Sequence, residues 1–111
     1  MEEHAAQELG QFARFLAEDV AIQDGAVVSR TLLNRPTGTI TLFAFDQGQG
    51  LSEHTAPFDA FIYAVMGSAE ITISGRSQVV EKGQALILPA GEPHALRARE
   101  PFKMLLVMIR S

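Results

Sequence analysis

The chain has no cysteine among its 111 residues. This absence excludes disulfides, thiolate metal sites and cysteine nucleophiles together. No apolar run reaches the roughly 18–20 residues that a membrane-spanning helix requires. The N-terminus is acidic and lacks the basic-then-apolar pattern of a secretory signal. We therefore expect a cytoplasmic protein that does not bind membranes.

Basic residues are also scarce, because nine lysines and arginines stand against thirteen acids and give a formal net charge of -4. Nucleic acid is excluded as a partner, since binding to phosphate backbones needs a basic surface. The hydrophobic fraction of 47% and the charged fraction of 20% are typical of globular proteins. The length suits one domain, which we expect to span residues 1–111.

Strand patterns dominate the chain after Gly25. Short apolar segments alternate with turn residues, as in Asn34-Arg35-Pro36-Thr37-Gly38 and Ser74-Gly75-Arg76. Seven or eight short strands are predicted in this region, at residues 26–33, 39–45, 61–66, 69–73, 77–80, 85–88, 94–98 and 102–109. This spacing predicts an all-β fold over about residues 25–111, a small antiparallel β-barrel or double-sheet jelly roll.

Two features lie outside a simple barrel pattern. Leu9, Phe12, Ala13 and Leu16 follow helical spacing, which predicts a short N-terminal helix over about residues 3–17, within an extension covering about residues 1–20. The strand at 39–45 is apolar on both faces. A second sheet on one face and a partner subunit on the other would cover it, so this strand favours a homodimer.

The chain holds only three histidines, His4, His54 and His94. His54 follows Gly48 after five residues, and a further glycine, Gly67, lies downstream. The stretch around His94 has the spacing Gly83-x5-Pro89-x-Gly91-x2-His94-x3-Ala98. We expect His4, on the predicted helix, to be a solvated side chain.

The two stretches resemble the conserved motifs of the cupin superfamily, G-x5-H-x-H-x3-4-E-x6-G and G-x5-P-x-G-x2-H-x3-N. The chain is similar to small single-domain, RmlC-like cupins of uncharacterised function. The resemblance implies a jelly-roll barrel and a homodimer. In cupins that bind metal, three histidines and the glutamate coordinate the ion. Here His54 and His94 stand at two of these positions, and Ala56 and Ala60 stand at the other two.

The resemblance thus implies a degenerate metal site in which His54 and His94 hold a divalent transition metal weakly. A catalytic metal typically takes about three protein ligands. Asp59 lies one position from the missing glutamate, but that shift turns its side chain to the opposite face of a strand unless the chain bulges. Two other interpretations stay open: a metal-free pocket in which the histidines bind a ligand or act as acid and base, and a purely structural role.

Inward positions of such a barrel are expected to line a ligand pocket. We assign this role to Phe43, Ile62, Met66, Leu96 and Met104. The alanines at 56 and 60 leave space and an apolar wall, which favours a small, partly apolar ligand. The predicted function is therefore binding of a small molecule of unknown identity. The alternatives are a metal-dependent oxygenase and a metal-free isomerase or decarboxylase that uses His54 and His94.

Overall fold

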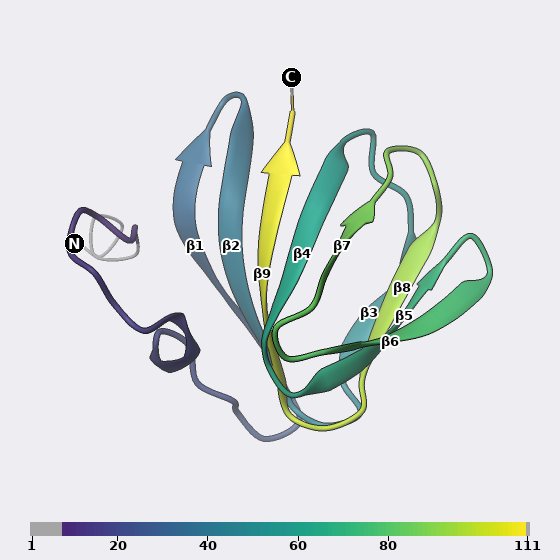
Figure 1. Cartoon of the computed structure of the whole chain (residues 1–111), viewed down its shortest axis with the longest axis horizontal. Coiled ribbons are helices and arrows are strands. Elements are labelled where there is room, and N and C mark those ends of the chain that lie inside the picture. The colour runs from purple at the N-terminus through teal and green to yellow at the C-terminus, as the bar shows by residue number, and fades with distance from the viewer. Residues whose placement is uncertain (1–7, 111) are drawn as a thin grey trace.

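The computed structural model describes residues 8–110, which form nine strands and one 3-10 helix. The elements are η1 (Leu16–Glu18), β1 (Val27–Arg35), β2 (Gly38–Phe45), β3 (Gly50–His54), β4 (Asp59–Met66), β5 (Ser68–Ile73), β6 (Arg76–Glu81), β7 (Ala85–Leu88), β8 (His94–Ala98) and β9 (Phe102–Ile109). A five-stranded sheet has the order β1-β2-β9-β4-β7, and a four-stranded sheet has the order β3-β8-β5-β6 (Figure 1). Every strand pair is antiparallel. The predicted all-β double-sheet fold is confirmed.

Alternation of side chains along the strands builds the core between the two sheets. On β4, Ala60, Ile62 and Ala64 are buried, while Phe61 and Tyr63 point outward and are exposed. The inner faces of both sheets contribute to one apolar cluster, made of Phe45, Ala60, Ile62, Ala64, Ala69, Ile71, Val80, Leu88, Leu96, Ala98, Phe102 and Met104. Burial of these side chains is the main source of stability, at roughly 25 cal/mol per Å² of apolar surface.

Strand β3 is the element that the sequence pattern misses. Its residues, Gly-Leu-Ser-Glu-His, are mostly polar and have weak strand propensity. Pairing with β8 holds these residues in a strand. Gly50 lies opposite Arg97 and Leu51 opposite Leu96, and the register is irregular before His54. A methyl group at Gly50 would overlap the carbonyl oxygen of Leu96, so this close approach of the two backbones needs glycine.

The predicted N-terminal helix is wrong in the part that the structure describes. Residues 8–15 are irregular, and only η1 is helical. Gly10 has φ +76°, a left-handed conformation that interrupts a helix. The backbone N–H of Leu9 donates to the carbonyl of Leu32 at 2.9 Å, so this segment runs against β1 instead. Residues 1–7 and His4 lie outside the described part. No helix in residues 8–110 is long and apolar enough to cross a bilayer.

The N-terminal segment covers the outer face of β2. Val20 packs in a second apolar cluster with Leu32, Leu42 and Ala44. This contact accounts for the strand that is apolar on both faces, because one face meets the core and the other meets the chain's own N-terminal segment. The sequence pattern alone did not distinguish this cover from a partner subunit, and the homodimer stays a prediction.

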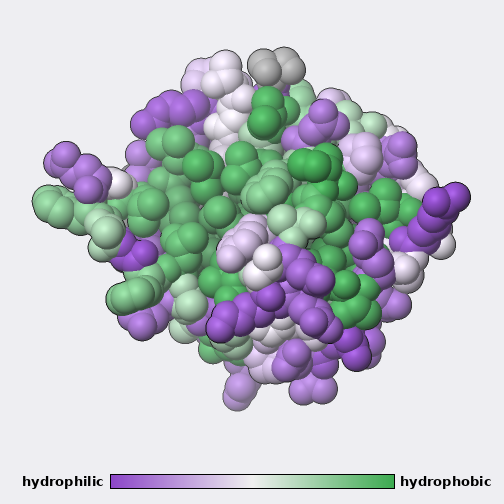
Figure 2. All heavy atoms as spheres, viewed as in Figure 1, coloured by the Kyte–Doolittle hydropathy of each residue, from purple (hydrophilic) through white to green (hydrophobic). Residues whose placement is uncertain are grey.

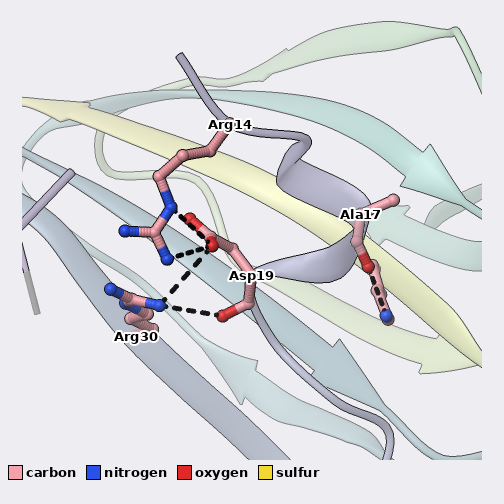
Figure 3. A network of polar contacts seen from close by, with 5 residues as sticks. Arg14, Ala17, Asp19 and Arg30 are labelled. Atoms are coloured by element: carbon pink, nitrogen blue, oxygen red, sulfur yellow. Dashed lines mark hydrogen bonds and ion pairs between the residues drawn. The ribbon is translucent and has the colours of Figure 1, made fainter. Parts of the chain in front are cut away.

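A polar network holds the N-terminal segment on the sheet (Figure 3). The carboxylate of Asp19 is buried, accepts a hydrogen bond from Nε of Arg14 at 2.9 Å and lies 3.6 Å from the guanidinium of Arg30. The ammonium of Lys103, on β9, donates to the carbonyl of Ala17. Buried charges of this kind need their partners, so the network fixes the path of the segment across β1, β2 and β9.

Large apolar side chains stay exposed on the outer face of β4, β7 and β9. They are Phe61, Tyr63, Ile87 and Ile109. Phe61 lies opposite Ile87 on β7 and opposite Val107 on β9, so these positions adjoin one another. Figure 2 shows a broad hydrophobic area across the strands of the larger sheet on the face in view.

We predict that Gly50→Ala lowers the free energy of unfolding by about 1–3 kcal/mol, because β3 must move away from β8 to relieve the overlap with Leu96. Urea denaturation measures the change. Ser52→Ala is the matched control, since Ser52 is exposed on the same strand. Equal stability of the two variants would contradict the close packing of β3 on β8.

Candidate functional site

His54 and His94 meet at the junction of β3 and β8. They are register partners on the two antiparallel strands, which places their side chains on the same face. Their rings meet edge to face, with centroids 4.3 Å apart and an interplanar angle of 71°. The two Nε2 atoms are 3.1 Å apart. Two residues that are 40 positions apart in sequence thus form one dyad.

The opposite nitrogen of each ring is held by the backbone. Nδ1 of His54 lies 2.8 Å from the carbonyl oxygen of Ser52, and Nδ1 of His94 lies 3.2 Å from the carbonyl oxygen of Glu92. A carbonyl oxygen only accepts, so each Nδ1 carries a hydrogen and donates it. In two neutral rings, both Nε2 atoms are then bare acceptors. A hydrogen bond between them requires one additional, shared proton.

Burial lowers the pKa of His94 below the ordinary 6.5, and repulsion from His54 acts in the same direction. The hydrogen bond to the Glu92 carbonyl partly opposes this shift, because it stabilises the protonated ring. His94 is therefore the ring that favours the neutral form.

The loop between β7 and β8 is anchored beside the dyad by the segment between β3 and β4. The N–H of Gly91 donates to the carbonyl of Ala56 at 2.8 Å. The N–H of Ala90 donates to the carboxylate of Asp59, also at 2.8 Å. Asp59 is thus exposed and bonded to the loop. The alternative in which a bulge brings Asp59 beside the histidines does not occur.

The turn between β5 and β6 holds the other end of this loop. The N–H of Ser74 donates to the carbonyl of Pro93 at 2.8 Å, and its hydroxyl donates to the carboxylate of Glu92 at 2.7 Å. Since the carbonyl of Glu92 orients the ring of His94, these contacts fix that ring indirectly. Sequence reasoning did not identify Ser74 or Glu92, because nothing in the pattern relates the two loops.

An apolar cavity of about 70 Å³ opens onto the dyad. Its walls are Leu51, His54, Ala56, Phe58, Ala60, Ile62, Ile71, Leu88, His94, Ala95, Leu96, Met104, Leu106 and Met108. Among these side chains of the described chain, only the two imidazoles carry nitrogen or oxygen atoms. The cavity therefore offers one polar site and otherwise apolar surface.

Three of the five residues assigned to a pocket from the sequence line this cavity, namely Ile62, Leu96 and Met104. Their part in binding stays a prediction. Phe43 instead stacks on Phe45, with ring centroids 5.8 Å apart. Met66 lies at the far end of β4, next to an irregularity in its pairing with β9.

The wall residues on β9 that the sequence analysis missed are Leu106 and Met108. Continued alternation from Met104 places both on the inner face of the strand, so the signal was present. The cavity lies near the end of the barrel where β8 begins and β9 ends, and position along a strand cannot be read from alternation.

The donor set does not fit a resident catalytic metal. Within residues 8–110, no group of three or more histidine, cysteine, aspartate or glutamate side chains lies together. Ala56 and Ala60 line the cavity with methyl groups where the resemblance implies two further ligands. Two Nε2 atoms supply only part of the about three protein ligands that a catalytic metal takes.

The lowered pKa of His94 predicts how stability depends on pH. The unfolded chain binds a proton at His94 more readily than the folded chain, so the free energy of unfolding falls as the pH drops below 6.5 toward the lowered pKa. Chemical denaturation across this range measures the slope. His94→Gln should flatten it, whereas His54→Gln should leave the His94 part largely in place, because burial is the larger cause. An unchanged slope in His94→Gln would contradict the assignment.

Comparison with known proteins identifies the family. The family model for the cupin domain matches residues 41–109 of the chain. The structure of a conserved protein of unknown function from Streptococcus pyogenes is similar, with 40% identity, a TM-score of 0.86, and coverage of 94% of this chain and 90% of that one. A cupin superfamily protein from Desulfitobacterium hafniense has 25% identity, a TM-score of 0.88, and coverage of 95% and 96%.

A cupin 2 conserved barrel domain protein from Leptotrichia buccalis is 37% identical, with a TM-score of 0.81 over 84% of this chain and 45% of that one. No curated protein matches the chain. The matched residues and the shared barrel show that the chain belongs to the cupin family, as a small member with a cavity of small-molecule size.

Proposed function

We propose that the chain binds a small organic molecule, with the apolar part of the ligand in the cavity and its polar head at the His54–His94 dyad. One observation carries the proposal: an apolar cavity opens onto two imidazoles whose Nδ1 atoms are already bonded and whose Nε2 atoms face each other. Such a combination of apolar walls and one polar anchor is typical of small-molecule sites.

The size of the cavity limits the ligand. Its volume of about 70 Å³ corresponds to roughly five water-sized spheres. A branched chain of about four to six carbon atoms is of a size that such a space accommodates. Burial of such a group contributes about 0.8 kcal/mol per CH₂, so the apolar part supplies most of the affinity.

The lone pairs of the two Nε2 atoms can bind either a proton or a divalent metal. An ion bound by two imidazoles alone would be labile, because a third protein ligand is missing in the described chain. A metal-dependent oxygenase is therefore the less supported alternative. Proton transfer by the dyad, as in an isomerase or decarboxylase, needs no further ligand and is the second candidate.

We predict that the protein retains less than stoichiometric metal after dialysis, and that zinc or cobalt added to it is removed by a weak chelator. Elemental analysis before and after dialysis measures this. His94→Gln provides the comparison, because any uptake at the dyad must disappear in it. Stoichiometric metal that survives dialysis in the wild type and is lost in His94→Gln would show a third ligand outside residues 8–110 or from a second subunit.

Filling the cavity tests the ligand site directly. Ala60 lines the cavity, while Ala64 is fully buried four residues further along the same face of β4 and does not line it. We predict that Ala60→Leu leaves stability within about 1 kcal/mol of the wild type and abolishes ligand binding, because the added carbons occupy the cavity. Ala64→Leu should cost about 1–3 kcal/mol by overpacking. Equal destabilisation of both variants, measured by urea denaturation, would contradict the cavity.

A further inference from the structure

We infer that this site selects small apolar molecules whose head group donates a hydrogen bond, such as a hydroxyl or an amine, over carboxylates and other anions. The inference rests on the proposed function and adds the chemical class of the ligand. It comes from the hydrogen-bonding capacity of the dyad and from the charges of the surrounding segments.

The hydrogen-bonding groups of the two rings favour a donor head group. Both Nδ1–H groups are already used, by the carbonyls of Ser52 and Glu92. Two neutral rings therefore present only acceptors at the cavity, the lone pairs of the two Nε2 atoms. A carboxylate also has only acceptor atoms, so it cannot form a hydrogen bond with these nitrogens. A hydroxyl or an amine brings the hydrogen that the site lacks.

The geometry of the dyad adds to this requirement. When both rings are neutral, no hydrogen lies between the Nε2 atoms, which are 3.1 Å apart, and their lone pairs repel each other. A donor at the mouth of the cavity relieves this repulsion by supplying a hydrogen to one or both atoms. The remaining walls offer the ligand no other side-chain nitrogen or oxygen in residues 8–110, so a single polar head is sufficient.

The charge of the segments around the mouth of the cavity also disfavours anions. No lysine or arginine occurs in residues 49–62 or 83–96, which carry β3, the first half of β4, β7 and the start of β8. The same segments carry three carboxylates, those of Glu53, Asp59 and Glu92. These groups are exposed and partly screened, but all have the sign that disfavours an anion.

A matched set of probes tests the class of ligand. Isopentanol, isopentylamine and isovalerate share one branched five-carbon skeleton and differ in the head group. Titration at neutral pH, followed by the methyl resonances of Ala56 and Ala60 and the ring nitrogens of the histidines, measures each dissociation constant. We expect the alcohol and the amine to bind about tenfold or more tightly than the carboxylate, since the anion leaves desolvated acceptors unpaired.

Two variants separate the possible outcomes. His54→Gln replaces an exposed imidazole by an amide, whose N–H can donate to a carboxylate. This variant should therefore discriminate less strongly against isovalerate, and His94→Gln should have the same effect. Ala60→Leu should abolish binding of all three probes. If isovalerate binds the wild type as tightly as the other two and Ala60→Leu abolishes this, the inference is overturned and the proposed site stands. If no probe binds, or Ala60→Leu leaves binding intact, the proposed function itself fails.

Discussion

The site depends on the antiparallel pairing of β3 with β8. This pairing sets His54 opposite His94 and brings their Nε2 atoms to 3.1 Å, although each histidine lies at the end of a short strand. It is possible only because Gly50 lets the two backbones approach at the other end of β3. The core beneath, shared by both sheets, holds β8 in place. The loops on either side then fix the rings through the carbonyls of Ser52 and Glu92.

Alanines at positions 56 and 60 shape the chemistry of this end of the barrel. Their methyl groups line an apolar cavity, in whose described wall the two imidazoles are the only polar side chains. Burial and mutual repulsion keep His94 inclined to the neutral form. The barrel is thus shared with the cupin family, while the properties of the site come from the side chains that line it.

Much of the fold could be predicted from the sequence, because strands with a buried face show alternation that is independent of their neighbours. The strands around Ile62, Ile71 and Met104 are examples. Two elements could not be predicted. Strand β3 is polar and is ordered by pairing with β8, and the segment around Leu9 has helical spacing but is broken at Gly10 and bonded to β1. In both cases tertiary contacts override local preference.

The candidate site was predictable in part for a similar reason. Motif spacing located His54 and His94, and alternation placed Ile62 inside, but neither gives depth along the barrel axis. Phe43 and Met66 therefore were assigned to the pocket but do not line the cavity. The backbone bonds of the two rings also depend on loop conformation, which local sequence does not fix.

The central claim is that both histidines of the dyad keep their hydrogens on Nδ1 and leave Nε2 free to accept. Nitrogen-15 NMR of the histidine rings tests this most directly, because the two ring nitrogens have different shifts when one is protonated and the other is bare. At a pH above the usual pKa of histidine, the account predicts the Nδ1–H tautomer for both His54 and His94. The Nε2–H tautomer in either ring would contradict it.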